Sequence, residues 1–383
     1  MEIPFHKAYT DENDTAAAVA AINSGWLTMG PRTFEFENKF RAEVNASHAV
    51  AVNSCTAALH LALKVMGLKA DDEVIIPAMT FTASGEVVSY FNANPVIVDV
   101  DRETHNILPE EIERAITSKS RVIMPVHFGG QPADMDSILE IAKRHKLLVI
   151  EDAAHCFPSF YKKRPIGSIG DITAFSFYAT KTLACGEGGM ATTENAEWDE
   201  AMRVQRLHGI SRDAWKRYSK EGTWFYEVID AGHKYNMTDI QAALGLAQLA
   251  KADRMWQLRT AIAERYNTAF GGSEYFRIPV IHPENKTSWH LYVIQLQIEK
   301  LTIDRNRFIE LLAERNIKTS VHFIPLYRHP YYKKICPVDF NRMKNSEWLY
   351  ERIISLPIYP GMTSAETDYV IDNVLELTRK YGR

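Results

Sequence analysis

The sequence lacks the features that hold disulfide-rich, zinc-binding and membrane-spanning proteins together. Its 383 residues include only four cysteines, and no two of them form a Cys-x-x-Cys pair. We therefore expect free thiols and no metal site. No stretch reaches the roughly 18 uninterrupted apolar residues of a membrane helix, and the first seven residues are not a charged segment followed by an apolar one. These absences predict a cytoplasmic protein with no membrane partner.

An excess of positive charge is also missing. Lysine and arginine total 44 against 48 for aspartate and glutamate, the formal net charge is −4, and no segment concentrates basic residues. A protein that follows a phosphate backbone needs such a concentration, so nucleic acid is an unfavoured partner. Hydrophobic residues make up 46% of the chain and charged residues 24%. This composition is typical of a globular protein with a large core.

Short motifs of several enzyme classes are absent as well. No Gly-x-Gly-x-x-Gly follows an expected strand, and the sequence contains no Gly-Lys-Ser/Thr, no His-Glu-x-x-His and no Gly-x-Ser-x-Gly. Dinucleotide redox chemistry, nucleotide-driven phosphoryl transfer, zinc-dependent proteolysis and α/β-hydrolase chemistry therefore lose support.

Short β-branched runs alternate with amphipathic stretches in the first half of the sequence. We expect seven strands, at residues 49–53, 73–77, 95–99, 121–125, 147–151, 172–177 and 189–193. Most are continuously apolar, which is typical of strands covered on both faces in a mainly parallel sheet. Helices are expected between them, for example at 56–66 and 134–146. The pattern predicts an α/β domain whose ligand lies at the carboxyl ends of the strands.

The last third of the sequence has a different pattern. Thr238 and Asp239 can cap a long helix that runs past Leu258 and links two domains. Further strands are expected at residues 291–298 and 317–323, and helices at 304–315, near 347 and at 365–381. We therefore predict a large α/β domain at residues 1–250, which includes the N-terminal segment, and a small C-terminal α+β domain at residues 251–383.

Two motifs stand where expected strands end. Asn53-Ser-Cys-Thr-Ala57 joins a strand to a helix start, where free backbone amides and the helix dipole can bind an anion, although an ordinary N-cap is the commoner explanation. Glu151-Asp-Ala-Ala-His155 places two carboxylates at a strand end. A buried carboxylate there needs a cationic or hydrogen-bonding partner, and a protonated heterocycle nitrogen would serve. Asp152 could equally be a helix cap.

Two further motifs carry a lysine and an asparagine. Phe175-Ser-Phe-Tyr-Ala-Thr-Lys181 is followed by Gly186-Glu-Gly-Gly189. Loop lysines are mostly solvated, but hydroxyls, aromatic rings and a glycine-rich turn enclose this one. Desolvation would lower its pKa and favour the neutral amine that a Schiff base requires. In Lys234-Tyr-Asn-Met-Thr-Asp239, a helix cap accounts for the last two residues and leaves Asn236 unexplained.

Taken in order, these segments resemble the DegT/DnrJ/EryC1/StrS family of sugar aminotransferases, which are fold-type I pyridoxal phosphate (PLP) enzymes. The resemblance runs from residues 24–31 to residues 356–362, and its most specific pieces are residues 151–155, 176–189 and 235–244. It implies a mainly parallel central sheet flanked by helices, with a smaller C-terminal α+β domain. Within the family, the chain is similar to UDP-4-amino-4-deoxy-L-arabinose synthase-like C4 aminotransferases.

The resemblance implies roles around the cofactor ring. Lys181 would bind PLP covalently and move protons during the reaction. Asp152 would keep the pyridinium nitrogen protonated, so that the ring acts as an electron sink. His155 would lie beside the ring or its phenolic oxygen. Phe81 would stack on the ring, and a core phenylalanine is the alternative at that position.

The phosphate group of the cofactor has its own expected ligands. The backbone amides of Thr56 and Ala57 and the hydroxyl of Ser176 would bind it. Asn236 would reach the phosphate held by the neighbouring subunit. The resemblance therefore implies a homodimer whose active site is shared across the interface.

Substrate-binding residues are matched less specifically. Six residues stand in segments that approach the nucleotide sugar in the family, each with a packing role as its alternative: Trp26, Thr28, Met29, Arg212, His322 and Tyr327. Tyr178 stands where similar enzymes often have His, and Phe81 where they often have Trp, which puts the identity of the sugar in doubt. Glu187 is typical of C4-directed members, whereas C3-directed members more often carry Asp.

The resemblance implies transfer of the amino group of L-glutamate to a UDP-4-keto-6-deoxy or related sugar, with release of 2-oxoglutarate and ping-pong kinetics. The product would enter surface polysaccharide or glycan biosynthesis. Some relatives carry His in place of the lysine and are dehydratases or deoxygenases. The presence of Lys181 argues against those activities here. The alternatives are a C3-directed enzyme, one acting on a GDP- or dTDP-linked sugar or a cyclitol, and a regulatory protein that keeps the fold without turnover.

Overall fold

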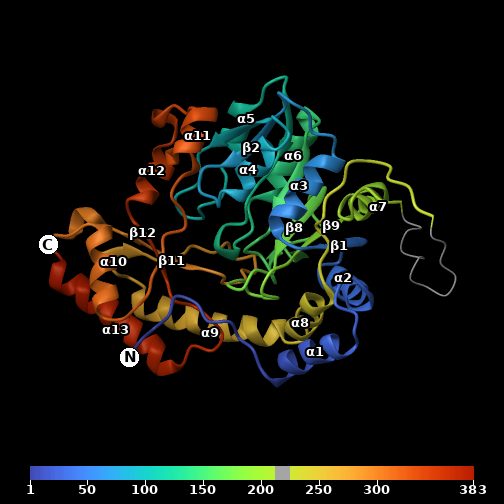
Figure 1. Cartoon of the computed structure of the whole chain (residues 1–383). Coiled ribbons are helices and arrows are strands. Elements are labelled where there is room, and N and C mark those ends of the chain that lie inside the picture. Colours follow the sequence, from blue (N-terminus) through green and yellow to red (C-terminus); the bar gives the residue numbers. More distant parts are fainter. Residues whose placement is uncertain (212–224) are drawn as a thin grey trace.

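A seven-stranded sheet forms the centre of the computed structural model, which describes residues 1–211 and 225–383 (Figure 1). Its order is β1-β9-β8-β5-β4-β2-β3. The strands are β1 (His48–Val52), β2 (Glu73–Pro77), β3 (Asn94–Val98), β4 (Ser120–Ile123), β5 (Leu148–Asp152), β8 (Ile172–Ser176) and β9 (Gly189–Thr193). Only β9 runs antiparallel to its neighbours within this sheet. All seven predicted strands are confirmed, and so is the mainly parallel α/β fold.

Helices cover both faces of this sheet, which explains why its strands are continuously apolar. Val50 and Val52 of β1 pack into one core with α3 (Cys55–Val65) and Met202 of α7 (Ala196–Gln205). Ala49 and Ala51 point to the opposite core. That core is covered by α2 (Pro31–Glu43), α6 (Met135–His145) and α8 (Asp239–Leu249). Other elements of this part of the chain are α1 (Glu12–Asn23), α4 (Ala83–Ser89), α5 (Pro109–Ala115), β6 (Phe160–Tyr161) and β7 (Arg164–Pro165).

A second body is built mainly from the C-terminal elements, seen on the left side of Figure 1. These are α9 (Ala252–Phe270), β10 (Phe276–Arg277), β11 (Tyr292–Leu296), α10 (Arg305–Glu314), α11 (Pro330–Ile335), α12 (Lys344–Tyr350), β12 (Ile353–Leu356) and α13 (Ser364–Tyr381). The three strands form a small sheet in the order β10-β11-β12. Ile3 from the N-terminal segment packs into the core of this body. The domain boundary at residue 250 stays a prediction.

Two sequence-based expectations are wrong in detail. The long helix after Thr238 is broken into α8 and α9, because Lys251 leaves helical geometry at φ −119° and ψ 14°. Its ammonium group pairs with Asp11 and Asp14, which hold the break against α1. The strand expected at residues 317–323 forms only isolated bridges, at Ile317 and Ser320.

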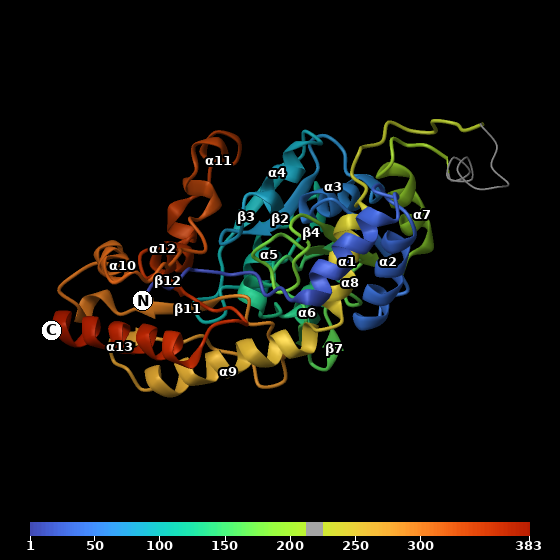
Figure 2. The ribbon, with the colours of Figure 1, turned by 60° about the horizontal axis from the view of Figure 1, so that its bottom comes forward.

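Figure 2 shows α8 beside α1 and α2, followed by α9 along the lower edge of the C-terminal body. None of the helices within residues 1–211 and 225–383 combines the length and apolar character needed to span a bilayer.

Candidate active site

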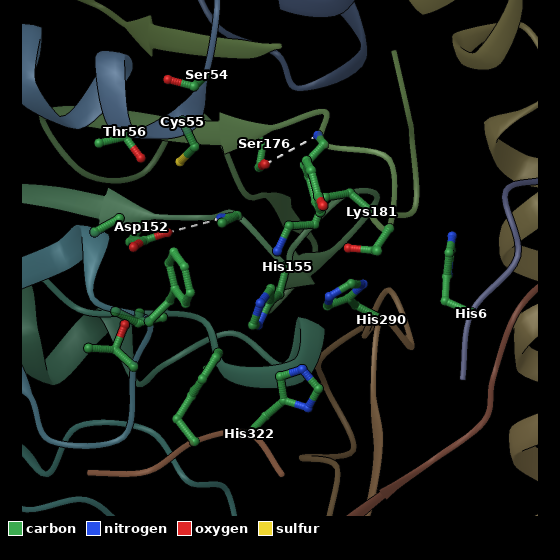
Figure 3. A pocket seen from close by; sticks show the side chains of 18 of the residues that line it. His6, Ser54, Cys55, Thr56, Asp152, His155, Ser176, Lys181, His290 and His322 are labelled. Atoms are coloured by element: carbon green, nitrogen blue, oxygen red, sulfur yellow. Dashed lines mark hydrogen bonds between the residues drawn. The ribbon is translucent and has the colours of Figure 1, made fainter. Parts of the chain in front are cut away.

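A cavity of about 490 Å³ lies at the carboxyl ends of β5 and β8, beside the N-terminus of α3 (Figure 3). The sequence predicted a ligand at these strand ends. Further walls of the cavity come from the loops after β2 and β8, the N-terminal segment, the residue before Leu291 and the segment before α11. Nine of the predicted site residues line it: Thr56, Phe81, Asp152, His155, Ser176, Tyr178, Lys181, Glu187 and His322.

Lys181 lies in the turn that follows β8, where its backbone N–H donates to the carbonyl of Tyr178 at 2.8 Å. Burial lowers the pKa of its amine from 10.5 to about 8, and the nearby Cys55 and Asp152 oppose that shift only in part. No hydrogen bond or ion pair from another described residue engages the amine. A substantial fraction of the side chain is therefore neutral and nucleophilic near neutral pH.

Asp152 ends β5 and is 4% exposed. Its Oδ2 accepts a hydrogen bond from the hydroxyl of Ser84 at 2.8 Å, and its Oδ1 accepts one from the backbone N–H of Ala154 at 3.1 Å. Burial raises the pKa of this carboxyl group, while these two hydrogen bonds act in the opposite direction. A cationic partner in the cavity would offset the remaining free-energy cost of burying this carboxylate.

The adjacent carboxylate, Glu151, points to the other side of the strand and has a structural role. It is fully buried, pairs with Nε2 of His127 at 2.9 Å, and accepts from the N–H of Gly170 and the hydroxyl of Thr173. Burial opposes ionisation, but the bond to His127 and the other donors keep the pKa of Glu151 below its usual value. Strand alternation thus gives only Asp152 to the cavity.

His155 presents a neutral imidazole to the cavity. Its Nδ1 accepts a hydrogen bond from the backbone N–H of Gly129 at 3.3 Å, so the ring proton belongs on Nε2. Burial lowers the pKa of His155 well below its ordinary value. The ring stacks on Phe323 at 5.8 Å between centroids and lies 4.4 Å from the ring of His290.

The N-terminus of α3 faces the cavity, and one of the two predicted amides already has an acceptor within the chain. Ser54 caps the helix and accepts the N–H of Ala57 at 3.1 Å, so that amide is already occupied. The N–H groups of Cys55 and Thr56, at the first two helical positions, have no intrahelical acceptor. Ser176 also lines the cavity, and its Oγ accepts the N–H of Tyr178 at 3.4 Å.

Asn236 does not line the cavity of its own chain. It lies beside β1, forming an isolated bridge with Val52. Its Nδ2 donates to the carbonyl of Met237 at 3.3 Å, while its buried Oδ1 has no partner among the described residues.

Four other predicted residues are also not brought to the cavity, namely Trp26, Thr28, Met29 and Tyr327. Trp26, Thr28 and Met29 lie between α1 and α2, where Met29 is buried and accepts the indole N–H of Trp26 at 3.0 Å. Tyr327 is 1% exposed and donates its hydroxyl to Glu347 at 2.7 Å, which is a packing role. Arg212 lies outside the described residues.

The sequence analysis missed several residues that line or support the cavity. These are Phe5, His6, Cys55, Ser84, His290 and Phe323. None belongs to a motif with a recognisable chemical spacing. Cys55 stood inside the motif of residues 53–57, so its place beside the strand end was the one signal available.

The residues present fit PLP. A buried amine without a counter-ion, a buried carboxylate with room for a cation, and two open amides at a helix start would receive its aldehyde, ring nitrogen and phosphate. The fold and this arrangement together define a PLP-dependent enzyme.

Comparison with known proteins gives the family. The sequence profile of the DegT/DnrJ/EryC1/StrS aminotransferase family matches residues 8–375, and the chain belongs to that family. It is 49% identical over 375 residues to an uncharacterized protein of Methanocaldococcus jannaschii, covering 98% of this chain and 97% of that one. It is 47% identical over 378 residues to the spore coat polysaccharide biosynthesis protein SpsC of Bacillus subtilis, with the same coverages.

Solved structures agree with this assignment. The PLP form of a putative sugar aminotransferase of Streptococcus pneumoniae superposes with a TM-score of 0.93 at 32% identity, covering 99% of each chain. The chain is therefore a PLP-dependent sugar aminotransferase, and the predictions of family, fold class, enzyme class and cofactor are confirmed.

Proposed function

We propose that the enzyme transfers the amino group of L-glutamate to C4 of a UDP-linked keto sugar, a UDP-4-keto-6-deoxy or related sugar, and releases 2-oxoglutarate. The observation that carries this proposal is the buried, unpaired amine of Lys181, with its lowered pKa, in the same cavity as Asp152. Glu187 in the C4-type Gly186-Glu-Gly-Gly189 motif favours C4 over C3. The similarity to SpsC supports a product destined for a polysaccharide.

The chain's own residues divide the chemical work. When bound, PLP supplies an electron sink and a carrier for the amino group. Lys181 attaches it and then acts as general acid and base, because its pKa of about 8 allows both protonation states near neutral pH. Asp152 holds a proton on the ring nitrogen by charge pairing. His155 offers its Nε2 proton as a hydrogen-bond donor to the phenolic oxygen.

The phosphate end is held by neutral donors and the helix dipole. The amides of Cys55 and Thr56 lie at the N-terminus of α3, where the helix dipole favours a dianion. The hydroxyl of Ser176 would be a further donor. Phe81 is 60% exposed at the cavity and offers a ring face for stacking. Tyr178, Glu187 and His322 then remain for the sugar and its nucleotide.

The active site is shared between two subunits of a homodimer. Asn236 has a buried oxygen without a partner and does not line its own chain's cavity. Leu27, Val228 and Ile229 are 51%, 64% and 62% exposed, so a second copy would find apolar side chains to cover. A second copy that covers them can bring Asn236 to the partner's phosphate.

The test is product analysis with purified protein and L-glutamate. We expect PLP uptake with a visible chromophore that borohydride traps at Lys181, and amination at C4 of a UDP-4-keto sugar in preference to GDP- and dTDP-linked analogues. Lys181→Ala should abolish turnover. NMR of the product that locates the new amine at C3, or equal use of all three nucleotides, would overturn the substrate proposal.

A further inference from the structure

The end of the cavity opposite α3 is lined by imidazole rings from four separate segments of the chain (Figure 3). These are His6, His155, His290 and His322. The phosphate cradle and Asp152 lie toward the other end (Figure 3). Of these four rings only His155 has a role at the cofactor, so His6, His290 and His322 are available to recognise another ligand.

His290 is the ring in this group without a hydrogen bond. It is 7% exposed, and its buried Nδ1 has no partner among the described residues. Its contact with His155 is a tilted ring pair, which satisfies neither nitrogen. Buried polar groups are nearly always paired, so an imidazole that lines a cavity without a hydrogen bond to the described residues points to a ligand with a complementary group.

The three other rings are held in place by their second nitrogens. Nε2 of His6 donates to the carbonyl of Ala179 at 3.1 Å, and Nδ1 of His322 pairs with the hydroxyl of Ser355 at 2.8 Å. His155 is fixed by Gly129, as described above. Each ring thus keeps one nitrogen for the cavity at little further cost in side-chain entropy.

A buried positive charge, that of Arg259, lies near these imidazole rings. Arg259 is 1% exposed and donates from Nη1 to the carbonyls of Trp289 and Ile358, at 3.2 and 2.8 Å. It forms no salt bridge with a carboxylate of the described residues, and its buried Nε is unpaired. Burial lowers its pKa to about 9, which still leaves it charged at neutral pH. The charge of Arg259 acts on His290 and would attract an anion placed there.

We propose that this end of the cavity is a carboxylate subsite, with His290 as its hydrogen-bond donor, and that it receives a carboxylate of the amino-acid donor. The inference rests on the proposed function, since it names how the same site recognises L-glutamate. A carboxylate supplies the acceptor that His290 lacks and the negative charge that Arg259 lacks. A neutral N–H donor with a buried cation nearby binds a carboxylate both by a hydrogen bond and by charge attraction.

The test uses holoenzyme loaded with PLP and the unreactive probe glutarate, which has two carboxylates and no amine to transfer. Calorimetric titration should give a Kd for wild type that rises about tenfold or more in His290→Gln, as expected for loss of a hydrogen bond to a charged group. Butyrate should bind more weakly than glutarate to the wild type. His105→Gln is the matched control, because His105 is also buried but lies outside the cavity.

The outcomes separate the two levels of the proposal. A wild type that takes up no PLP overturns the proposed function before glutarate is added. If His290→Gln keeps its PLP absorbance and melting temperature but binds glutarate as tightly as wild type, the carboxylate subsite is wrong and the aminotransferase assignment stands. If UDP binding falls in His290→Gln while glutarate binding does not, the anion at this end is the diphosphate of the sugar substrate, which also overturns the proposal.

Discussion

The hydroxyl of Ser84 donates a hydrogen bond to Oδ2 of Asp152 at 2.8 Å, although 67 residues separate them in the sequence. Ser84 is itself fully buried, and its oxygen pairs with the hydroxyl of Thr80 at 2.7 Å. The two hydroxyls form a short relay that ends on the carboxylate. Ser84 therefore sets both the orientation of Asp152 and the ease with which it stays ionised.

Ser84→Ala should weaken cofactor binding. It removes a hydrogen bond that lowers the pKa of Asp152, so the carboxylate pairs less well with a protonated ring nitrogen. We expect the Kd for PLP to rise about tenfold, the usual size for a lost hydrogen bond to a charged group. Absorbance titration measures it. Thr80→Val keeps the direct donor and should have a smaller effect; equal Kd values in all three proteins would contradict the relay.

Lys181→Met should stabilise the cofactor-free protein at neutral pH. The folded-state pKa of about 8 lies below the ordinary lysine pKa of 10.5, so between these pH values the folded chain binds fewer protons than the unfolded chain and stability rises with pH. The variant should gain up to about 3 kcal/mol at pH 7 and lose that advantage above pH 10.5. Urea unfolding at pH 7 and at about pH 11 gives both values. An advantage independent of pH would point to packing instead of ionisation.

Asp239→Ala should cost about 3 kcal/mol of unfolding free energy, because a buried carboxylate with four donors is lost. Asp239 accepts from the N–H groups of Gly30, Arg32 and Thr33 and from the hydroxyl of Thr33, which fixes the start of α2 to α8. Chemical denaturation measures the loss. Asp134→Ala removes the exposed cap of α6 and should cost about 1 kcal/mol. Equal losses in the two variants would contradict this account.

Mixed dimers should recover activity from two inactive parents if the site is shared. Lys181→Ala removes the amine, and Asn236→Asp places a negative charge beside the partner's phosphate. A heterodimer of the two has one intact site, so random mixing should restore about a quarter of wild-type activity. Co-expression with two different tags allows the heterodimer to be isolated. No recovery in that species would place both residues in one subunit's site.

The main sheet could be predicted because its strands carry the signal locally. Runs such as Val74-Ile-Ile76 are apolar at every position, which only a sheet covered on both faces accommodates. The break at Lys251 could not be predicted, since the aspartates that hold it lie about 240 residues away in the sequence. The expected strand at 317–323 failed for a similar reason: after one bridge to Ser355, the chain leaves β12 and lines the cavity.

The positions of Lys181 and Asp152 could be predicted from the sequence, whereas those of His6 and His290 could not. Lys181 and Asp152 stand at strand ends, where sequence order alone places them at one edge of the sheet. His6 and His290 reach the cavity through tertiary packing, and nothing near either residue marks its role. The phosphate amides stay a prediction, and the sequence could not show that the Ser54 hydroxyl already accepts the N–H of Ala57.

Phe5 stacks on His322 with ring centroids 5.5 Å apart, so the N-terminal segment meets the segment before α11 at one wall of the cavity. Contacts with such large sequence separation form late, because long loops must close before they can be made. The sheet edge with Lys181 and Asp152 can fold from local βαβ units well before that wall exists. A newly made chain should therefore acquire the chemical groups of catalysis earlier than the enclosure that lets them discriminate between substrates.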